Sequence, residues 1–161
     1  MLRQGLNIFG KPLFFHYFVK KMLLNLSYND PKVDAMVNET VGMPFSLKNR
    51  ILLKGIGSGR FYISQASAGL LNILVLDQNV NWCNVEMRPR GIIVRFRKLL
   101  ETYAFVVPYH KLTLYKTDFG YSLHKDAQFL TLQAADSKEL KKFMDKIISF
   151  KANYLTDQPD F

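Results

Sequence analysis

The chain of 161 residues has little cysteine, since Cys83 is the only one. A single cysteine cannot form an internal disulfide, and it excludes a metal site built from several thiolates. This favours a reducing compartment, so we expect a cytoplasmic protein. Cys83 follows Trp82 in a stretch where apolar and polar residues alternate. That pattern predicts a small buried hydrophobe in a strand rather than a nucleophile.

Long hydrophobic runs are also missing near the N-terminus. Residues 1–29 contain many large apolar side chains and no acidic one, but His16 and Lys20-Lys21 interrupt them. None of the apolar runs between these interruptions approaches the roughly 20 residues that a membrane-spanning helix needs. A secretory signal would need an unbroken apolar stretch of about 7–15 residues and a small-residue cleavage site. We therefore expect neither feature here.

Three interpretations of residues 1–35 stay open. The segment predicts an extra helix from Pro12 to about Leu26 that packs on the domain or on a partner. It also fits a basic amphipathic helix that lies on a membrane surface. In the third interpretation Met36 is the true start, and the preceding residues come from an overlong gene model. The turn signal Asn29-Asp30-Pro31 would end a helix in either of the first two cases.

The charge is positive but spread over the chain. The formal net charge is +9, which suits nucleic acid, an anionic membrane surface or simple solubility. Residues 1–35 carry five basic and two acidic side chains, and residues 36–161 carry seventeen and eleven. No long basic run and no RNA-binding, helix-turn-helix or zinc-finger spacing is visible. Nucleic acid is therefore not an expected partner.

The clearest single element is a C-terminal amphipathic helix from Ser137 to about Tyr154. Asp136 or Ser137 can cap it, and Glu139 completes a capping box with Asp136. Lysines and Asp145 fall on the opposite face from the apolar residues. The apolar residues recur at the spacing of one helical face: Leu140, Phe143, Met144, Ile147 and Ile148.

Most of the chain before this helix has the period-two alternation of strands, with turn residues between them. The glycines of Gly57-Ser58-Gly59 indicate a turn or bulge, because no Lys-Ser/Thr pair follows as in a phosphate-binding loop. The expected strands cover residues 50–56, 60–64, 69–76, 80–87, 92–97, 101–107, 112–114, 119–123 and 129–133.

Short strands at this regular spacing, followed by one helix, predict a mainly β (α+β) fold. We expect an antiparallel β-sandwich or partly open barrel of about seven strands, closed by the C-terminal helix. The predicted organisation is a helical arm over residues 1–35, a single domain over residues 36–155, and a polar tail over residues 156–161.

Several short sequence segments resemble those of the bacterial PH-like and GRAM-like domains of the pleckstrin-homology-like superfold. The resemblance covers about residues 48–154 and depends on the order of the elements. The segments on which the resemblance depends are Asn49-Arg50-Ile51-Leu52-Leu53-Lys54-Gly55, Ala68-Gly69-Leu70-Leu71, Arg90-Gly91-Ile92-Ile93-Val94, Tyr103-Ala104-Phe105-Val106-Val107-Pro108-Tyr109, Tyr121-Ser122-Leu123-His124, Phe129-Leu130-Thr131-Leu132 and the final helix.

The resemblance implies a module that binds, because such domains bind phosphoinositide headgroups, peptides or other domains. Lipid-binding members carry Lys and Arg around the loop between their first two strands. The matching loop here, roughly Gly57–Gly69, offers only Arg60. The resemblance therefore does not imply headgroup binding by the usual route, and a shared fold does not by itself fix a function.

A basic cluster is the best candidate binding site. Arg95 and Arg97 share one strand face, about 6–7 Å apart along the strand. Arginine forks on one face can clamp a phosphate or a carboxylate, whereas the alternative is a solvated face or an edge protected by charge. The candidate residues are Arg88, Arg90, Arg95, Arg97, Lys98 and Tyr103.

Nothing in the sequence indicates catalysis or a cofactor. His16, His110 and His124 are far apart, and none has a neighbour at metal-ligand spacing. There is no Gly-x-Ser-x-Gly elbow and no isolated carboxylate pair in apolar surroundings. We expect a non-catalytic module that recognises a protein partner. The alternative is peripheral binding to anionic lipid through the basic residues and the N-terminal arm, and an enzyme comes third.

Overall fold

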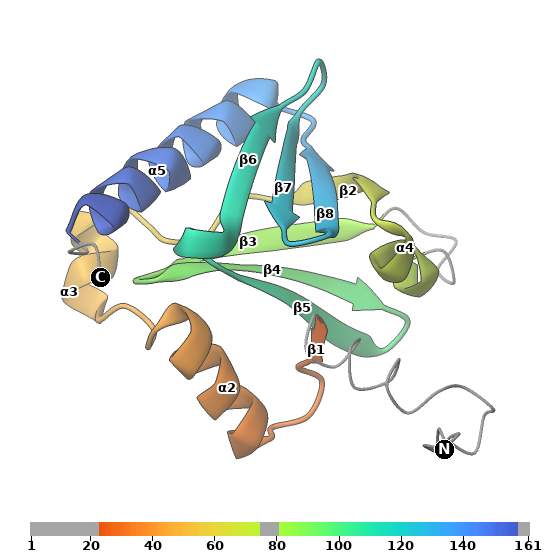
Figure 1. The fold of residues 1–161 in the computed structure, drawn as a ribbon, viewed down its shortest axis with the longest axis horizontal. Helices are drawn as coiled ribbons and strands as arrows, with labels where there is room; N and C mark the ends of the chain where they lie inside the picture. The colour runs from red at the N-terminus through yellow and green to blue at the C-terminus, as the bar shows by residue number, and fades with distance from the viewer. Residues whose placement is uncertain (1–22, 75–80, 158–161) are drawn as a thin grey trace, which may run out of the picture.

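The computed structural model describes residues 23–74 and 81–157, and it shows an α+β fold built on one antiparallel sheet of eight strands (Figure 1). The strand order is β1-β5-β4-β3-β2-β8-β7-β6. The elements are β1 (Leu23–Asn25), α2 (Pro31–Val41), α3 (Leu47–Leu52), β2 (Phe61–Ala66), α4 (Ala68–Leu74), β3 (Trp82–Arg88), β4 (Gly91–Lys98), β5 (Glu101–Pro108), η1 (Tyr109–Lys111), β6 (Leu112–Lys116), β7 (Tyr121–Lys125), β8 (Gln128–Gln133) and α5 (Ser137–Thr156).

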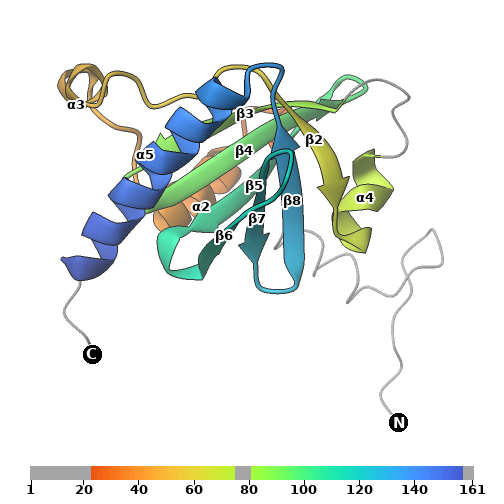
Figure 2. The ribbon, with the colours of Figure 1, turned by 90° about the horizontal axis from the view of Figure 1, so that it is seen from above.

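The sheet bends but does not close, so the predicted sandwich or partly open barrel is corrected to one open sheet. Strands β6, β7 and β8 stand across β3, β4 and β5 (Figures 1 and 2). Strands β5 and β6 are consecutive in the chain but are not paired, and β1 and β6 form the two edges. The 3₁₀ turn η1 follows Pro108 directly and redirects the chain between them.

Helix α5 packs on the concave side of this bent sheet, as the sequence predicted. The Asp136 side chain caps it by accepting hydrogen bonds from the backbone N–H groups of Lys138 and Glu139, at 2.8 and 3.4 Å. Ile148 differs from the prediction, because it is 43% exposed. The helix buries Leu140, Phe143, Met144 and Ile147 in the main core, which the inward residues of β2 to β8 complete.

A second, smaller core lies on the opposite face of the sheet, under α2 (Figure 1). Asp30 caps this helix by accepting from the Lys32 N–H at 2.9 Å, and Pro31 is its first residue. The turn signal at residues 29–31 therefore begins a helix instead of ending one. A Cβ at Gly91 would lie 2.5 Å from Val41 Cγ1 and 2.4 Å from the Val107 carbonyl oxygen, so only glycine permits this close approach.

Two of the expected strands are helices. Residues 50–56 fall largely in α3 and the turn after it, because the Ser46 hydroxyl caps α3 by accepting from the Asn49 N–H at 3.3 Å. The apolar run from residue 69 lies in α4, where Leu70 and Leu74 point into the core one helical turn apart. A short apolar run does not distinguish a buried strand from a buried helix. The resemblance in the opening pair of strands is therefore wrong.

The N-terminal segment also differs from the expected helix. Leu23–Asn25 forms strand β1, which pairs with β5 through Leu23 and Phe105. The remainder of the helix expected from Pro12 lies outside the described residues. Helix α2 runs through Met36 and buries Val37, so the expected boundary between residues 35 and 36 falls inside a helix.

The packing of α5 predicts unequal costs for two neighbouring substitutions. Met144→Ala should lower the free energy of unfolding by about 2–4 kcal/mol, because the Met144 side chain is fully buried. Ile148→Ala is the matched control on the same helix. It should cost less than about 1 kcal/mol, because much of that side chain already meets water. Urea unfolding measures both, and equal losses would contradict the observed packing.

Candidate functional site

The convex face of β2, β3 and β4, turned away from α5, carries aromatic and arginine side chains that we call the Trp82 face. Its register pairs Tyr62 with Trp82 and Asn84 with Arg95 across neighbouring strands. Alternate residues of these strands, such as Phe61, enter the main core, so the remaining ones must share the outer face. The Trp82 face consists of Arg60, Tyr62, Trp82, Arg95 and Arg97.

Trp82 is held at the centre of this face by two neighbours. The Arg60 guanidinium carbon lies 4.6 Å from the centroid of the Trp82 ring, which is a cation–π contact. The Tyr62 ring meets Trp82 edge to face, with centroids 5.9 Å apart, and its hydroxyl donates to Gln133 Oε1 at 2.7 Å. Trp82 nevertheless stays 39% exposed. The face therefore presents a large, oriented aromatic ring to solvent.

The Trp82 face has a surplus of positive charge. Arg60 and Arg97 are exposed, and neither belongs to an ion pair among the described residues. Arg95 forms an ion pair with Glu86 and remains one-third exposed. A surface of this kind attracts acidic groups.

Arg88 lies beside this face, but its hydrogen bonds stabilise the fold. It is buried, and its guanidinium donates to Glu86 Oε1, to Asn38 Oδ1 at 3.2 Å and to the Gly42 carbonyl oxygen at 3.1 Å. It thereby joins β3 to the C-terminal end of α2. Glu86 is shared, because its other carboxylate oxygen accepts from Arg95.

The other predicted residues do not join the Trp82 face. Arg90 donates to the carbonyl oxygens of Asn38 and Glu39, at 3.1 and 2.7 Å, and so satisfies the end of α2. Lys98 pairs in register with Glu101 at the end of the β4–β5 hairpin.

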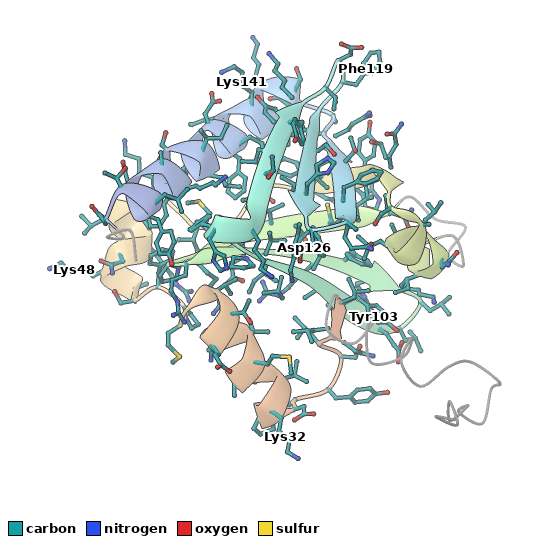
Figure 3. The ribbon with its side chains drawn as sticks, in the orientation of Figure 1. Lys32, Lys48, Tyr103, Phe119, Asp126 and Lys141 are labelled. Carbon is teal, nitrogen blue, oxygen red and sulfur yellow. The ribbon has the colours of Figure 1, made fainter. Side chains whose placement is uncertain are left out.

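Tyr103 is on the opposite side of the sheet, beside β1 (Figure 3). It stacks on Phe96 with centroids 6.2 Å apart, and its hydroxyl donates to Glu101. Burial, followed by the bond to Glu101, raises the pKa of Tyr103 to about 12. The predicted cluster is therefore split. Arg95 and Arg97 belong to the Trp82 face, Arg88 is buried beside it, and the other three residues lie elsewhere.

A pocket of about 320 Å³ opens between α2 and the sheet, next to the Trp82 face. Arg95 belongs to both, so the two features are continuous. Its lining combines two arginines, Arg88 and Arg95, with apolar residues of α2 and the segments that flank it. The lining residues are Leu26, Asp34, Val37, Asn38, Met43, Pro44, Arg88 and Arg95.

The Glu86 carboxyl accepts hydrogen bonds from both arginines of the pocket lining and has a lowered pKa. Its burial alone would raise the pKa of the Glu86 carboxyl. The charges and hydrogen bonds of Arg95 and Arg88 act in the opposite direction and hold that pKa below its usual value. One carboxylate therefore neutralises part of the charge of two guanidinium groups.

Sequence reasoning missed Arg60, Tyr62 and Trp82 as members of a site. A signal was present, because Trp82 and Asn84 alternate with Cys83 and Val85, which the same strand sends into the core. An aromatic residue on the outward phase of an amphipathic strand predicts an exposed ring. The partner strand was needed to show that Tyr62 and Arg60 gather around it.

One serine–histidine contact exists, on β7. The Ser122 Oγ and His124 Nε2 atoms are 2.8 Å apart, and Thr131 Oγ1 donates to Ser122 Oγ at 3.2 Å. Ser122 is buried, and the structure shows no carboxylate bonded to the His124 ring within the part of the chain it describes. His110 is exposed in η1, and His16 lies outside the described residues. In those ranges no three His, Cys, Asp or Glu side chains gather as metal ligands.

Comparison with known proteins gives no family. No protein-family model matches this sequence, and no curated protein matches it. None of the helices in residues 23–74 and 81–157 is both long and apolar enough to cross a membrane. The class that the structure defines is therefore an α+β domain with an eight-stranded antiparallel sheet and a long C-terminal helix.

The shared carboxylate predicts a pH-dependent stability difference. Glu86→Gln should lower the free energy of unfolding by about 1–3 kcal/mol at pH 7, because two arginines lose their counter-charge. The folded pKa of Glu86 lies below the unfolded value, about 4.3. Its contribution is therefore complete above that value and is lost as the pH falls through the folded pKa.

Urea unfolding of wild type and Glu86→Gln from pH 7 down to about pH 2.5 covers the interval below the unfolded pKa and measures this difference. The gap between the two proteins should narrow at the acidic end. Asp118→Asn, which removes an exposed carboxylate from the β6–β7 turn, is the control and should show almost no gap at any pH. A gap for Glu86→Gln that stays constant with pH would contradict the assignment.

Proposed function

We propose that the protein is a non-catalytic binding module that recognises an acidic protein partner through the Trp82 face. The observation that carries this proposal is the exposed Trp82 ring, fixed between Arg60 and Tyr62. Trp, Tyr and Arg are the residue types that contribute most of the binding energy at protein interfaces. The pre-set ring also reduces the conformational entropy that association costs.

The positive charge of the Trp82 face indicates which kind of partner surface would complement it. The Trp82 face and the neighbouring Arg88 carry four arginines against the single carboxylate of Glu86. A partner surface rich in Asp and Glu would complement it, increase the association rate and make binding sensitive to salt.

The order of the elements supports a finer proposal for the fold, namely a PH-like or GRAM-like domain in the cytoplasm. The seven strands β2 to β8 and the closing helix α5 follow the expected order. Helices α3 and α4 replace the expected opening strands. The functional proposal depends on the site and not on this likeness, since one fold hosts many functions.

A second candidate function is peripheral binding to anionic lipid, and α3 is the observation that favours it. This helix buries none of its residues, and Leu47, Ile51 and Leu52 are 68–75% exposed. Lys48 and Arg50 lie among them, and residues 40–76 contain no acidic side chain. Apolar side chains flanked by basic ones suit a membrane interface. The N-terminal arm, which the sequence also suggested for this role, lies outside the described residues.

The proposed function predicts which peptides the protein selects. A random peptide library displayed on phage should yield sequences enriched in Asp and Glu when panned against the full chain. The affinity of a recovered peptide should fall at least about tenfold for Trp82→Ala, because a central aromatic contact is lost. It should also fall for Arg97→Gln and at higher salt. Fluorescence anisotropy measures each affinity.

Phe119→Ala is the matched control, since Phe119 is 79% exposed at the tip of the β6–β7 hairpin and is not a member of the Trp82 face (Figure 3). Its affinity should equal that of the wild type. Recovery of no acidic peptide, or equal affinities for Trp82→Ala and wild type, would overturn the proposal. Liposome sedimentation at two salt concentrations tests the second candidate. Pelleting that is lost in Ile51→Glu but kept in Trp82→Ala would establish lipid binding through α3 instead.

A further inference from the structure

We infer that the pocket beside the Trp82 face receives the C-terminal residue of the partner chain, with its free carboxylate on Arg95 and its apolar side chain against α2. This inference rests on the proposed function and names the part of the partner that enters the protein. It depends on three features of the pocket: its positive charge, its apolar lining residues and its volume.

The two guanidinium groups that line the pocket differ in how many hydrogen bonds they already make within the protein. Arg88 is fixed on three sides by Glu86, Asn38 and Gly42. Arg95 meets only one oxygen of Glu86, is one-third exposed, and lines the pocket. A guanidinium has five N–H donors, so Arg95 retains donors for a second carboxylate. Two cations share one anion here, and an incoming carboxylate would balance the remaining charge.

The apolar lining residues favour a ligand that carries an apolar side chain next to its carboxylate. Leu26, Val37, Met43 and Pro44 line the pocket together with the two arginines. An internal Asp or Glu would bring a carboxylate but almost no apolar surface. A C-terminal Leu, Ile or Val carries both its carboxylate and its apolar side chain on the same Cα atom. The volume of about 320 Å³ has room for one such residue and not for a long segment.

Asp34 is the one lining group that opposes a carboxylate. It lies in the first turn of α2, where the positive end of the helix dipole compensates an acidic side chain. It is also exposed, so solvent and salt screen its charge from the two arginines. Its repulsion is therefore weaker than the attraction of Arg95, and its removal should strengthen binding about twofold.

The test uses the full chain and the peptide acetyl-Gly-Gly-Leu with a free C-terminus. Arginine side-chain and backbone NMR shifts of the pocket residues should change saturably, with a dissociation constant on the order of 1–10 mM. The same peptide amidated at its C-terminus, and acetyl-Gly-Asp-Gly-amide, should leave these shifts unchanged. Arg95→Gln should weaken binding about tenfold or more, because a charge-assisted hydrogen bond is lost.

Lys116→Gln is the matched control, because Lys116 is an exposed cation at the end of β6, belongs to neither the Trp82 face nor the pocket lining, and loses the same charge. It should bind the peptide acid as the wild type does. Met43→Glu places a new charge at an exposed lining position and should weaken binding without disturbing the core. Asp34→Asn should strengthen it.

Equal shifts with the acid and the amide, an unchanged affinity in Arg95→Gln, or no saturation by about 20 mM would overturn this inference. A response to acetyl-Gly-Asp-Gly-amide equal to that of the acid would assign the pocket to internal acidic side chains instead. The proposed function is tested separately, since Trp82→Ala and Arg97→Gln affect the Trp82 face and leave the pocket intact. Failure in the pocket with selection of acidic peptides retained would reject this inference alone.

Discussion

The buried guanidinium of Arg88 is the interaction on which the outer side of the molecule depends. A charge in this position is costly unless its partners are complete, and Glu86, Asn38 and the Gly42 carbonyl complete them. Two of these partners belong to α2 or its cap, so one side chain fixes the helix against the sheet. The position of α2 then decides which part of the convex face becomes a core and which part stays open.

The part of the convex face that α2 leaves uncovered differs chemically from the part that the helix covers. Under α2 the outward residues of β4 and β5 are apolar, as Ile93, Ala104 and Val106 show. Beyond the helix, the same outward phase carries Arg95 and Arg97 on β4 and Trp82 on β3. A single strand therefore contributes to a core at one end and to a binding surface at the other. The pocket lies at the boundary, which explains why its lining combines apolar residues with two arginines.

The sequence predicted the elements whose periodicity is long and unambiguous. The helix α5, its Asp136 cap and the seven strands β2 to β8 were all recognised from alternation and capping alone. The apolar runs that became α3 and α4 were assigned wrongly, because a run of a few apolar residues satisfies either period. Strand β1 could not be predicted, because its pairing depends on an edge of β5 about 80 residues later.

The candidate site was predicted in part for a related reason. The arginines on β4 stand out in the sequence because they share one phase of one strand. Tyr103 was grouped with them although it faces the main core, and Trp82 was passed over although it faces outward. Which residues gather on one surface is set by pairing between strands and by the helix that covers part of them. Neither is visible in a single segment.

The two ends of the strand order have a consequence for how the protein assembles. In the described part of the chain, β1 has three residues and β6 has five, and β6 ends in Lys116 before an exposed turn. Short edges that end in a lysine are poor templates for another strand. Within the described residues these edges therefore favour pairing with another copy less than long, uncharged edges would, and the faces of the sheet, where side chains and not backbone groups decide what is accepted, offer the larger surface to an incoming chain.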